Sequence, residues 1–163
     1  MATFSLPENC RIIEGLSPRV GGAGGSVLGA YISVKQYEKV YIVIHYAEVD
    51  GTSEVFGVMK SPLISGVGGI PTTELWRIWS NLDCAASDLL VERTAATSYA
   101  IGTGTTHKII VFEVDPAALS EGYDCIAGYG LSGIAATETY SMLYFGVPRY
   151  AGRVLTAPTA LTD

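Results

Sequence analysis

Apolar residues recur along this chain with the period of β-strands rather than that of helices. Residues 40–47 (VYIVIHYA) carry a β-branched or aromatic side chain at nearly every position, which is typical of a strand. Residues 108–114 (KIIVFEV) place apolar side chains on both faces of a predicted strand. Such a strand must be covered on both faces, so in a chain with few helices we expect a second sheet or another subunit as the cover.

Turn signals divide the remaining apolar stretches into further short strands. We expect these strands at residues 11–14, 26–34, 54–60, 76–79, 97–101 and 140–147, with one more starting at the Tyr-Asp-Cys step of residues 123–125. The Asp50-Gly51 step predicts a hairpin turn that pairs residues 40–47 with residues 54–60.

The segments between these strands are expected to be turns and loops. Residues 37–39 predict a turn and residues 61–73 a long loop rich in glycine and proline. The Asp-Pro step at residues 115–116 ends a strand, and its aspartate can cap a helical turn over residues 117–119. Residues 83–93 are compatible with either a helical turn or a strand.

Seven to nine short strands without a long amphipathic helix predict an all-β fold. The best match is a single, jelly-roll-like β-sandwich domain over residues 11–148. Residues 1–10 are expected to form an extended N-terminal arm, since Pro7 and Asn9 interrupt any regular element. Residues 149–163 are expected to form an extended C-terminal tail.

The composition indicates apolar surface that is buried against other chains. Charged residues make up 16% of the 163 residues, against roughly 25% in an average soluble domain. No apolar run approaches the roughly 18 residues of a membrane helix, so we expect no membrane association. Because large exposed apolar patches are rare on monomers, we expect a homo-oligomer, either a trimer or a dimer. A tightly packed domain with little surface charge is the alternative.

The charge balance and the cysteines exclude several classes of function. A net charge of −6 and scattered Lys and Arg residues argue against nucleic-acid binding. The N-terminus shows no secretion signal. Cys10, Cys84 and Cys125 are odd in number and far apart, so we expect reduced thiols and no zinc site.

Two glycine-rich motifs resemble ligand-binding loops but lack the necessary context. Residues 128–133 match G-x-G-x-x-G, yet no ribose-binding acid occurs about 20 residues further on, at residues 148–154. In residues 102–108, His107 stands where a phosphate loop needs glycine, and a strand follows instead of a helix. The sequence therefore predicts no cofactor, and a polar hairpin turn at residues 102–108.

No catalytic constellation is recognisable in the sequence. His45 shares a strand face with Tyr41 and Val43, and we interpret it as a hydrogen-bonded packing residue rather than a catalyst. Three pairs of nearby acids are interpreted as solvated carboxylates, with calcium binding as the alternative; they are Asp83 and Asp88, Glu113 and Asp115, and Glu48 and Asp50. We therefore expect a non-enzymatic protein without a metal.

Three stretches resemble small virion structural proteins of tailed bacteriophages and prophages. They are VFEVDPAAL…GYDCI at residues 111–126, IWSNLDCAASDLLVER at residues 78–93, and residues 148–163 with PRYAG early and ALTD at the end. They fall within the last ninety residues or so, a little over half the chain, and are structural rather than catalytic signatures. The resemblance implies a virion protein assembled in the cytoplasm of a host bacterium, with the major capsid protein or other virion proteins as partners.

Within that context we expect a capsid decoration or minor capsid protein whose arm and tail lie along neighbouring subunits. Trp76 and Trp79, three positions apart, lie on opposite faces of an extended segment, so one is expected in the core and the other at an edge. The candidate interface residues are Trp76, Trp79, Tyr144, Arg149, Tyr150 and Leu161. The alternatives are a carbohydrate-binding β-sandwich that uses a tryptophan and nearby tyrosines, and a tail or connector component of the same particle.

Overall fold

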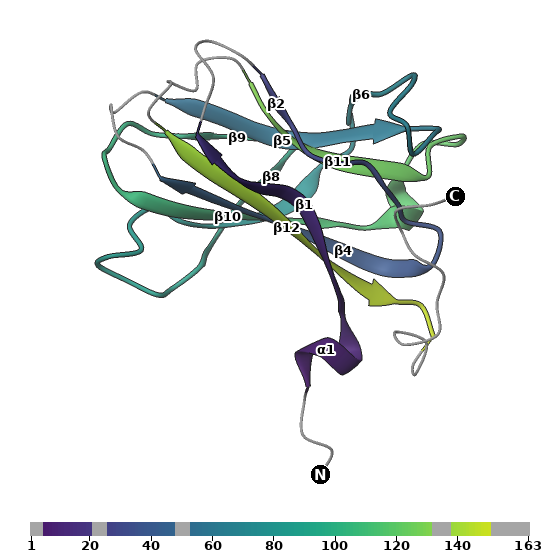
Figure 1. Ribbon diagram of the computed structural model, residues 1–163, viewed down its shortest axis with the longest axis horizontal. Helices are drawn as coiled ribbons and strands as arrows, with labels where there is room; N and C mark the ends of the chain where they lie inside the picture. The colour runs from purple at the N-terminus through teal and green to yellow at the C-terminus, as the bar shows by residue number, and fades with distance from the viewer. Residues whose placement is uncertain (1–4, 21–25, 48–52, 132–137, 151–163) are drawn as a thin grey trace.

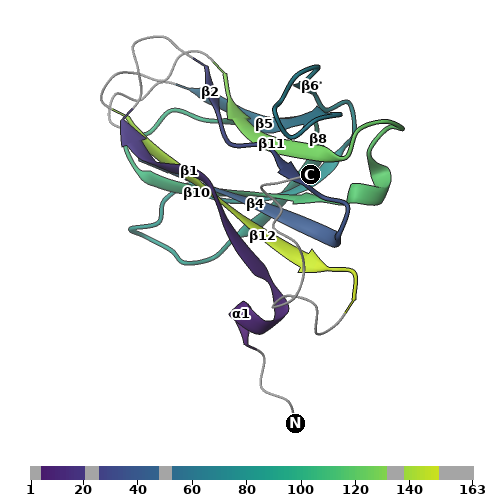
Figure 2. The same ribbon diagram turned by 45° about the vertical axis from the view of Figure 1, so that its right-hand side comes forward.

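Two antiparallel sheets pack face to face in the computed structural model, which describes residues 5–20, 26–47, 53–131 and 138–150 (Figures 1 and 2). Sheet A contains, in order, β1 (Arg11–Val20), β12 (Thr139–Pro148), β4 (Tyr37–Ala47), β10 (His107–Val114), β7 (Trp76–Asn81) and β8 (Val91–Ala96). Sheet B contains β2 (Val27–Leu28) and β3 (Ile32–Ser33) beside β11 (Cys125–Gly130), followed by β5 (Glu54–Ser61), which pairs with β6 (Ile70–Pro71) and β9 (Ser98–Ile101).

The strands pair in a nested order. β1 pairs with β12, β2 and β3 with β11, β4 with β10, and β5 with β9. The chain crosses to the other sheet after every strand except β2, β5 and β7, whose successors β3, β6 and β8 lie in the same sheet. β6, β7 and β8 lie between β5 and β9 in the chain, and β7 and β8 extend sheet A beyond β10. Nested pairing of this kind, in which a long two-stranded ribbon is wrapped into two packed sheets, is a jelly roll. The structure therefore confirms the predicted all-β sandwich.

The core lies between the two sheets and follows the two-residue period of the strands. Along β4, Val40, Ile42, Ile44 and Tyr46 are fully buried, whereas the residues between them face outward. Phe56 of β5 packs edge-on against Tyr46, with ring centroids 5.4 Å apart. The core therefore joins sheet A and sheet B directly through large side chains.

Several predicted element boundaries are wrong. Residues 6–9 form the short helix α1 (Leu6–Asn9), because Pro7 lies in its first turn, where a missing N–H costs nothing. Residues 37–39 begin β4 rather than a turn, since Tyr37 is buried and pairs with Pro148.

The predicted hairpin between residues 40–47 and residues 54–60 does not form, because β4 lies in sheet A and β5 in sheet B. Its Asp50-Gly51 step is outside the described residues. Residues 26–34 form two short strands instead of one, both paired with β11. The predicted cap is confirmed: Asp115 Oδ1 accepts the N–H of Ala117 at 2.9 Å, at the start of η1 (Pro116–Ala118). Across the described residues, none of the helices has the length and apolar character needed to cross a membrane.

Candidate interaction surface

Part of the outer face of sheet B is covered by the protein itself. Tyr31, Cys125 and Ala127 form a second apolar cluster there, with Met59 and Ile64 packed against it. Ile64 belongs to the loop of residues 62–69, which therefore covers this face.

The loop needs glycine where it approaches the Tyr31 ring. Gly66 has a φ of +78°, and a Cβ there would lie 2.6 Å from Tyr31 Cε2. The loop thus covers the part of sheet B around Tyr31.

The outer face of sheet A carries apolar side chains that neither apolar cluster of the described residues includes. Direct cross-strand pairing places these side chains next to one another across β12, β4 and β10. We call this surface the sheet A face; its central residues are Tyr41, Val43, Ile109, Val111, Leu143 and Phe145. Ile12 of β1 extends it on one side, opposite Phe145, and Trp79 of β7 extends it on the other, opposite Val111.

Two side chains of the sheet A face are strongly exposed. Leu143 is 42% exposed and Ile12 is 48% exposed, whereas Val111, in the middle of the sheet, is only 9% exposed. Leu143 lies between Glu14 on β1 and Val43 on β4. The exposed apolar area is therefore concentrated on β1 and β12.

The two tryptophans lie on opposite faces of β7, as their spacing predicts. Trp76 is buried in the core, where its Nε1 donates a hydrogen bond to Thr72 Oγ1 at 2.9 Å. Trp79 lies half-buried on the sheet A face, and the Arg77 guanidinium carbon is 4.6 Å from its ring centroid. A cation placed over the ring is attracted to its π face. Arg77 therefore occupies ring surface of Trp79 that a flat ligand would need.

The charged side chains beside Trp79 form ion pairs with one another. Glu113 pairs with Lys39, and the hydrogen bond that the Lys39 ammonium donates to this carboxylate raises the pKa of Lys39. Arg77 Nη1 lies 3.8 Å from Glu113 and Arg77 Nη2 lies 2.9 Å from Glu92. Two cations and two carboxylates thus form one connected, neutral group beside the apolar centre.

Both histidines of the chain lie together at one end of the sheet A face. His45 shares its face with Tyr41 and Val43, as predicted, but it is exposed rather than a packing residue. Its ring stacks on that of His107 with 5.9 Å between centroids. The backbone N–H of Cys84 donates to the carbonyl oxygen of His107 at 2.9 Å, so the turn after β7 borders this end.

The other predicted interface residues are scattered. Tyr144 is fully buried, and its hydroxyl accepts the Gly128 N–H at 3.0 Å, so it lies in the core rather than at a surface. Burial raises the pKa of Tyr144 to about 12. Arg149 donates from Nε to the carbonyl oxygen of Tyr37 at 2.9 Å, and Tyr150 is 65% exposed. Leu161 lies outside the described residues.

Of the five predicted interface residues that the structure describes, Trp79 alone lies on the sheet A face. Sequence reasoning missed Ile12 and Leu143. The available signal was that residues 140–147 are apolar on both faces, which made both Leu143 and Tyr144 candidates for the outward side. Burial of Tyr144 places Leu143 on the outer face.

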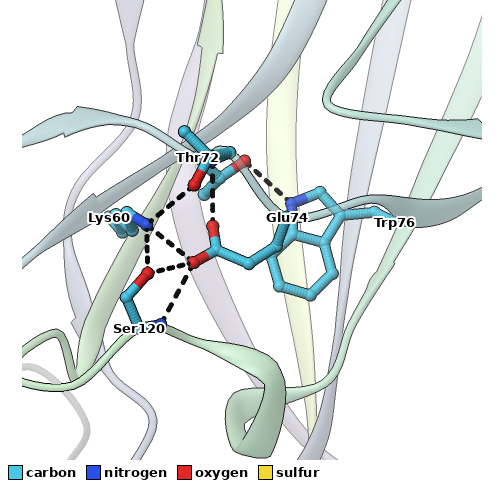
Figure 3. A network of polar contacts seen from close by, with 6 residues as sticks. Lys60, Thr72, Glu74, Trp76 and Ser120 are labelled. Atoms are coloured by element: carbon cyan, nitrogen blue, oxygen red, sulfur yellow. Dashed lines mark hydrogen bonds and ion pairs between the residues drawn. The ribbon is translucent and has the colours of Figure 1, made fainter.

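A part-buried polar network joins Lys60 of β5 to Glu74, which lies between β6 and β7, and to Ser120, which follows η1 (Figure 3). Lys60 Nζ donates to Glu74 Oε1 at 2.6 Å and to Ser120 Oγ at 2.7 Å, and it lies 5.0 Å from the Tyr123 ring centroid. Burial raises the pKa of Glu74, but hydrogen bonds from Lys60 and Ser120 outweigh the burial and hold it at about 2. A carboxylate that stays ionised at neutral pH is a structural partner for Lys60 and a poor general acid.

The remaining sequence motifs have local structural roles. Lys108 of the 102–108 segment is buried and donates to the Gly104 carbonyl oxygen at 2.7 Å, so it does not face a phosphate. Asp83 Oδ1 accepts the N–H groups of Ala85 and Ala86, both at 3.2 Å. Cys10, Cys84 and Cys125 all lie within the described residues and form no disulfide. Glu48 and Asp50 lie outside the described residues, among which no group of three or more His, Cys, Asp or Glu side chains is placed to hold a metal ion.

The sheet A face is thus a candidate surface for binding another macromolecule. No model of a known protein family matches the sequence, and no curated protein matches it either. Function is therefore inferred from the residues and the fold described above.

Proposed function

We propose that this protein is a non-enzymatic structural component of a tailed-phage particle, of the capsid decoration or minor capsid type. It docks on the major capsid protein or other virion proteins, associates with copies of itself, and is assembled in the cytoplasm of the host bacterium. The observation that carries the proposal is an apolar, electrically balanced outer face on the larger sheet of a jelly roll. Faces of this kind serve binding rather than catalysis.

Two further observations support this proposal. Jelly rolls occur in viral capsid proteins, although they also occur in lectins and enzymes, so the fold contributes by analogy only. The stretches that resemble phage virion proteins include the second half of β10, all of η1 and the first two residues of β11, which belong to central strands and a connection of the sandwich. The resemblance therefore concerns the framework of the domain.

The experiment is quantitative mass spectrometry of density-purified particles from the producing culture. The number of copies of this chain is measured against that of the main shell protein. Copies in the hundreds support a decoration role, whereas a few to a dozen copies move the protein to the tail or connector. Absence from the particles refutes a structural role in the virion.

A carbohydrate-binding sandwich is the second candidate, because Trp79 and Tyr41 lie on the same face of sheet A. Sugar rings stack on open aromatic faces, and Arg77 lies over the Trp79 ring. Sugar binding there requires Arg77 to move away from both of its carboxylate partners. A glycan array with the purified protein distinguishes the two candidates: saturable binding to a defined glycan supports this second function.

A further inference from the structure

The sheet A face has the extent of a complete protein–protein interface. Strands are spaced by about 4.8 Å and rise about 3.3 Å per residue, so the six strands of sheet A span a face on the order of 600 Å². A standard interface buries about 800 Å² on each partner. With the bordering side chains included, sheet A alone provides a surface of this size.

We infer that a second copy of this chain covers the sheet A face, and that the two six-stranded sheets pack face to face in a two-fold dimer. The inference rests on the self-association contained in the proposed function, and it specifies the surface and the symmetry. Two sheets that pack in this way lie about 10 Å apart, and their inner side chains interdigitate. Leu143 and Ile12 are the side chains that would gain most cover, since they are the most exposed apolar residues of the face.

The charges of the sheet A face favour a second copy of this chain over a basic partner. The chain carries a net charge of −6, so a strongly basic partner would be attracted to the molecule as a whole. At the β7 edge, however, Glu113 and Glu92 are already paired with Lys39 and Arg77. A basic partner would find both carboxylates engaged there, whereas a second copy presents a group around β7 whose charges are likewise already paired.

Two-fold symmetry also sets the two sheet A faces in a favourable arrangement. β1 and β8 are the outer strands of sheet A, and β12 and β7 lie next to them. A two-fold axis in the interface that runs along the strands sets β1 of one copy over β8 of the other, and β12 over β7. Leu143 of β12 would then lie over Trp79 of β7, and this apolar contact would occur twice in one dimer.

Sedimentation equilibrium of the purified full-length chain tests this inference. The wild type is expected to show twice the 17.2 kDa mass of the chain at micromolar concentration. Leu143→Lys should weaken the dimer at least tenfold, because each substitution occurs twice in a two-fold interface. The new ammonium would lie beside Glu14, so the variant keeps a compatible neighbour in the monomer.

Leu63→Lys is the matched control. Leu63 is 49% exposed, much like Leu143, but it precedes Ile64 in the loop that covers the outer face of sheet B. Its substitution should leave the dimer unchanged. As a second measurement, acrylamide quenching of tryptophan fluorescence should fall as wild-type concentration rises, because Trp79 becomes covered while Trp76 is buried throughout.

A wild type that stays monomeric to about 100 μM, a trimer, or a dimer equally sensitive to both leucine substitutions would overturn the inference. A monomer that binds a purified shell protein through Leu143 would also overturn it, since the occupant of the face would then be a different chain. Because the dimer is measured on the isolated protein and the virion role on purified particles, either can fail without the other.

Discussion

Replacing Glu74 by glutamine tests how strongly the buried ion pair stabilises the sandwich. Oε1 of Glu74 accepts hydrogen bonds from Lys60 Nζ at 2.6 Å and from the Ser120 hydroxyl and N–H at 2.6 and 3.1 Å (Figure 3). Oε2 accepts the Thr73 N–H at 3.0 Å. Glutamine offers one oxygen only, so its NH₂ group must face another donor, at either Thr73 or Lys60.

The free energy at stake follows from the pKa of Glu74. Its native value of about 2 lies below the ordinary value of 4.5, and each unit corresponds to about 1.4 kcal/mol. This shift implies about 3 kcal/mol, in line with the roughly 3–5 kcal/mol that removing one partner of a buried pair costs. We therefore expect Glu74→Gln to lower the free energy of unfolding by about 3 kcal/mol at neutral pH.

Urea unfolding across a range of pH gives this prediction a distinctive signature. Because the native-state pKa of Glu74 is lower than its unfolded-state pKa, the unfolded chain binds the proton first as the pH falls. The stabilisation is complete above about pH 5 and is lost as the pH decreases from about 4.5 toward 2. The difference between wild type and Glu74→Gln should narrow over the same window.

Glu92→Gln provides the control, since it removes a carboxylate that lies 2.9 Å from Arg77 in a pair whose side chains are both about half exposed. Exposed pairs contribute little, so unfolding of this variant should match the wild type within error. Equal losses in the two variants, or a Glu74→Gln difference that is as large at about pH 3 as at pH 7, would refute the reasoning.

Two further predictions concern the contacts of Tyr144. Tyr144→Phe leaves the buried Gly128 N–H without its acceptor and should cost about 2 kcal/mol in urea unfolding. Burial raises the pKa of Tyr144 from 10.0 to about 12, so the stability that this residue contributes is lost as the pH rises from about 10 to 12. The free energy of unfolding should therefore fall more in the wild type than in Tyr144→Phe over this range, and equal losses in the two proteins would contradict this. Gly15→Ala places a Cβ 2.7 Å from Tyr144 Cε2 and should cost about 2 kcal/mol by overpacking, measured by thermal unfolding. Gly102→Ala, with no neighbouring atom within 4 Å, should be neutral; similar losses at both glycines would contradict the packing argument.

The strands could be predicted from the sequence where the local pattern decides. Residues 40–47 and 108–114 form β4 and β10 because β-branched and aromatic side chains fill them, and the odd spacing of Trp76 and Trp79 sets their opposite faces. The Asp115 cap is equally local. These features depend only on residues a few positions apart.

The pairing of the strands could not be predicted in the same way. β1 pairs with β12 at the other end of the described chain, and no local signal specifies that partner. The Asp50-Gly51 step favours a hairpin, yet the two strands that flank it lie in different sheets. Tyr37 joins β4 because Pro148 and the core lie beside it. Tertiary packing determines these strand pairings, and a local sequence pattern contains no information about it.

The candidate surface depends on the same missing information. Residues 140–147 are apolar on both faces, and a shift of one residue in the register would exchange Leu143 with Tyr144. Tyr144 lies inside because Gly15 leaves room for its ring and Gly128 donates to its hydroxyl. Both glycines are remote from it in sequence, so the outward face of β12 is evident only from the assembled sandwich.

The apolar character of the sheet A face is not required for the isolated domain to fold. The core between the sheets is complete without it, and sheet B has its own covering loop. A solvated outer face of an antiparallel sheet is ordinarily polar, and threonine would satisfy the strand preference at Val43 or Leu143 equally well. The apolar side chains at these positions are therefore the basis of the proposed contact with a second copy of the chain. Substitution of Leu143 should accordingly weaken assembly while leaving the stability of the monomer almost unchanged.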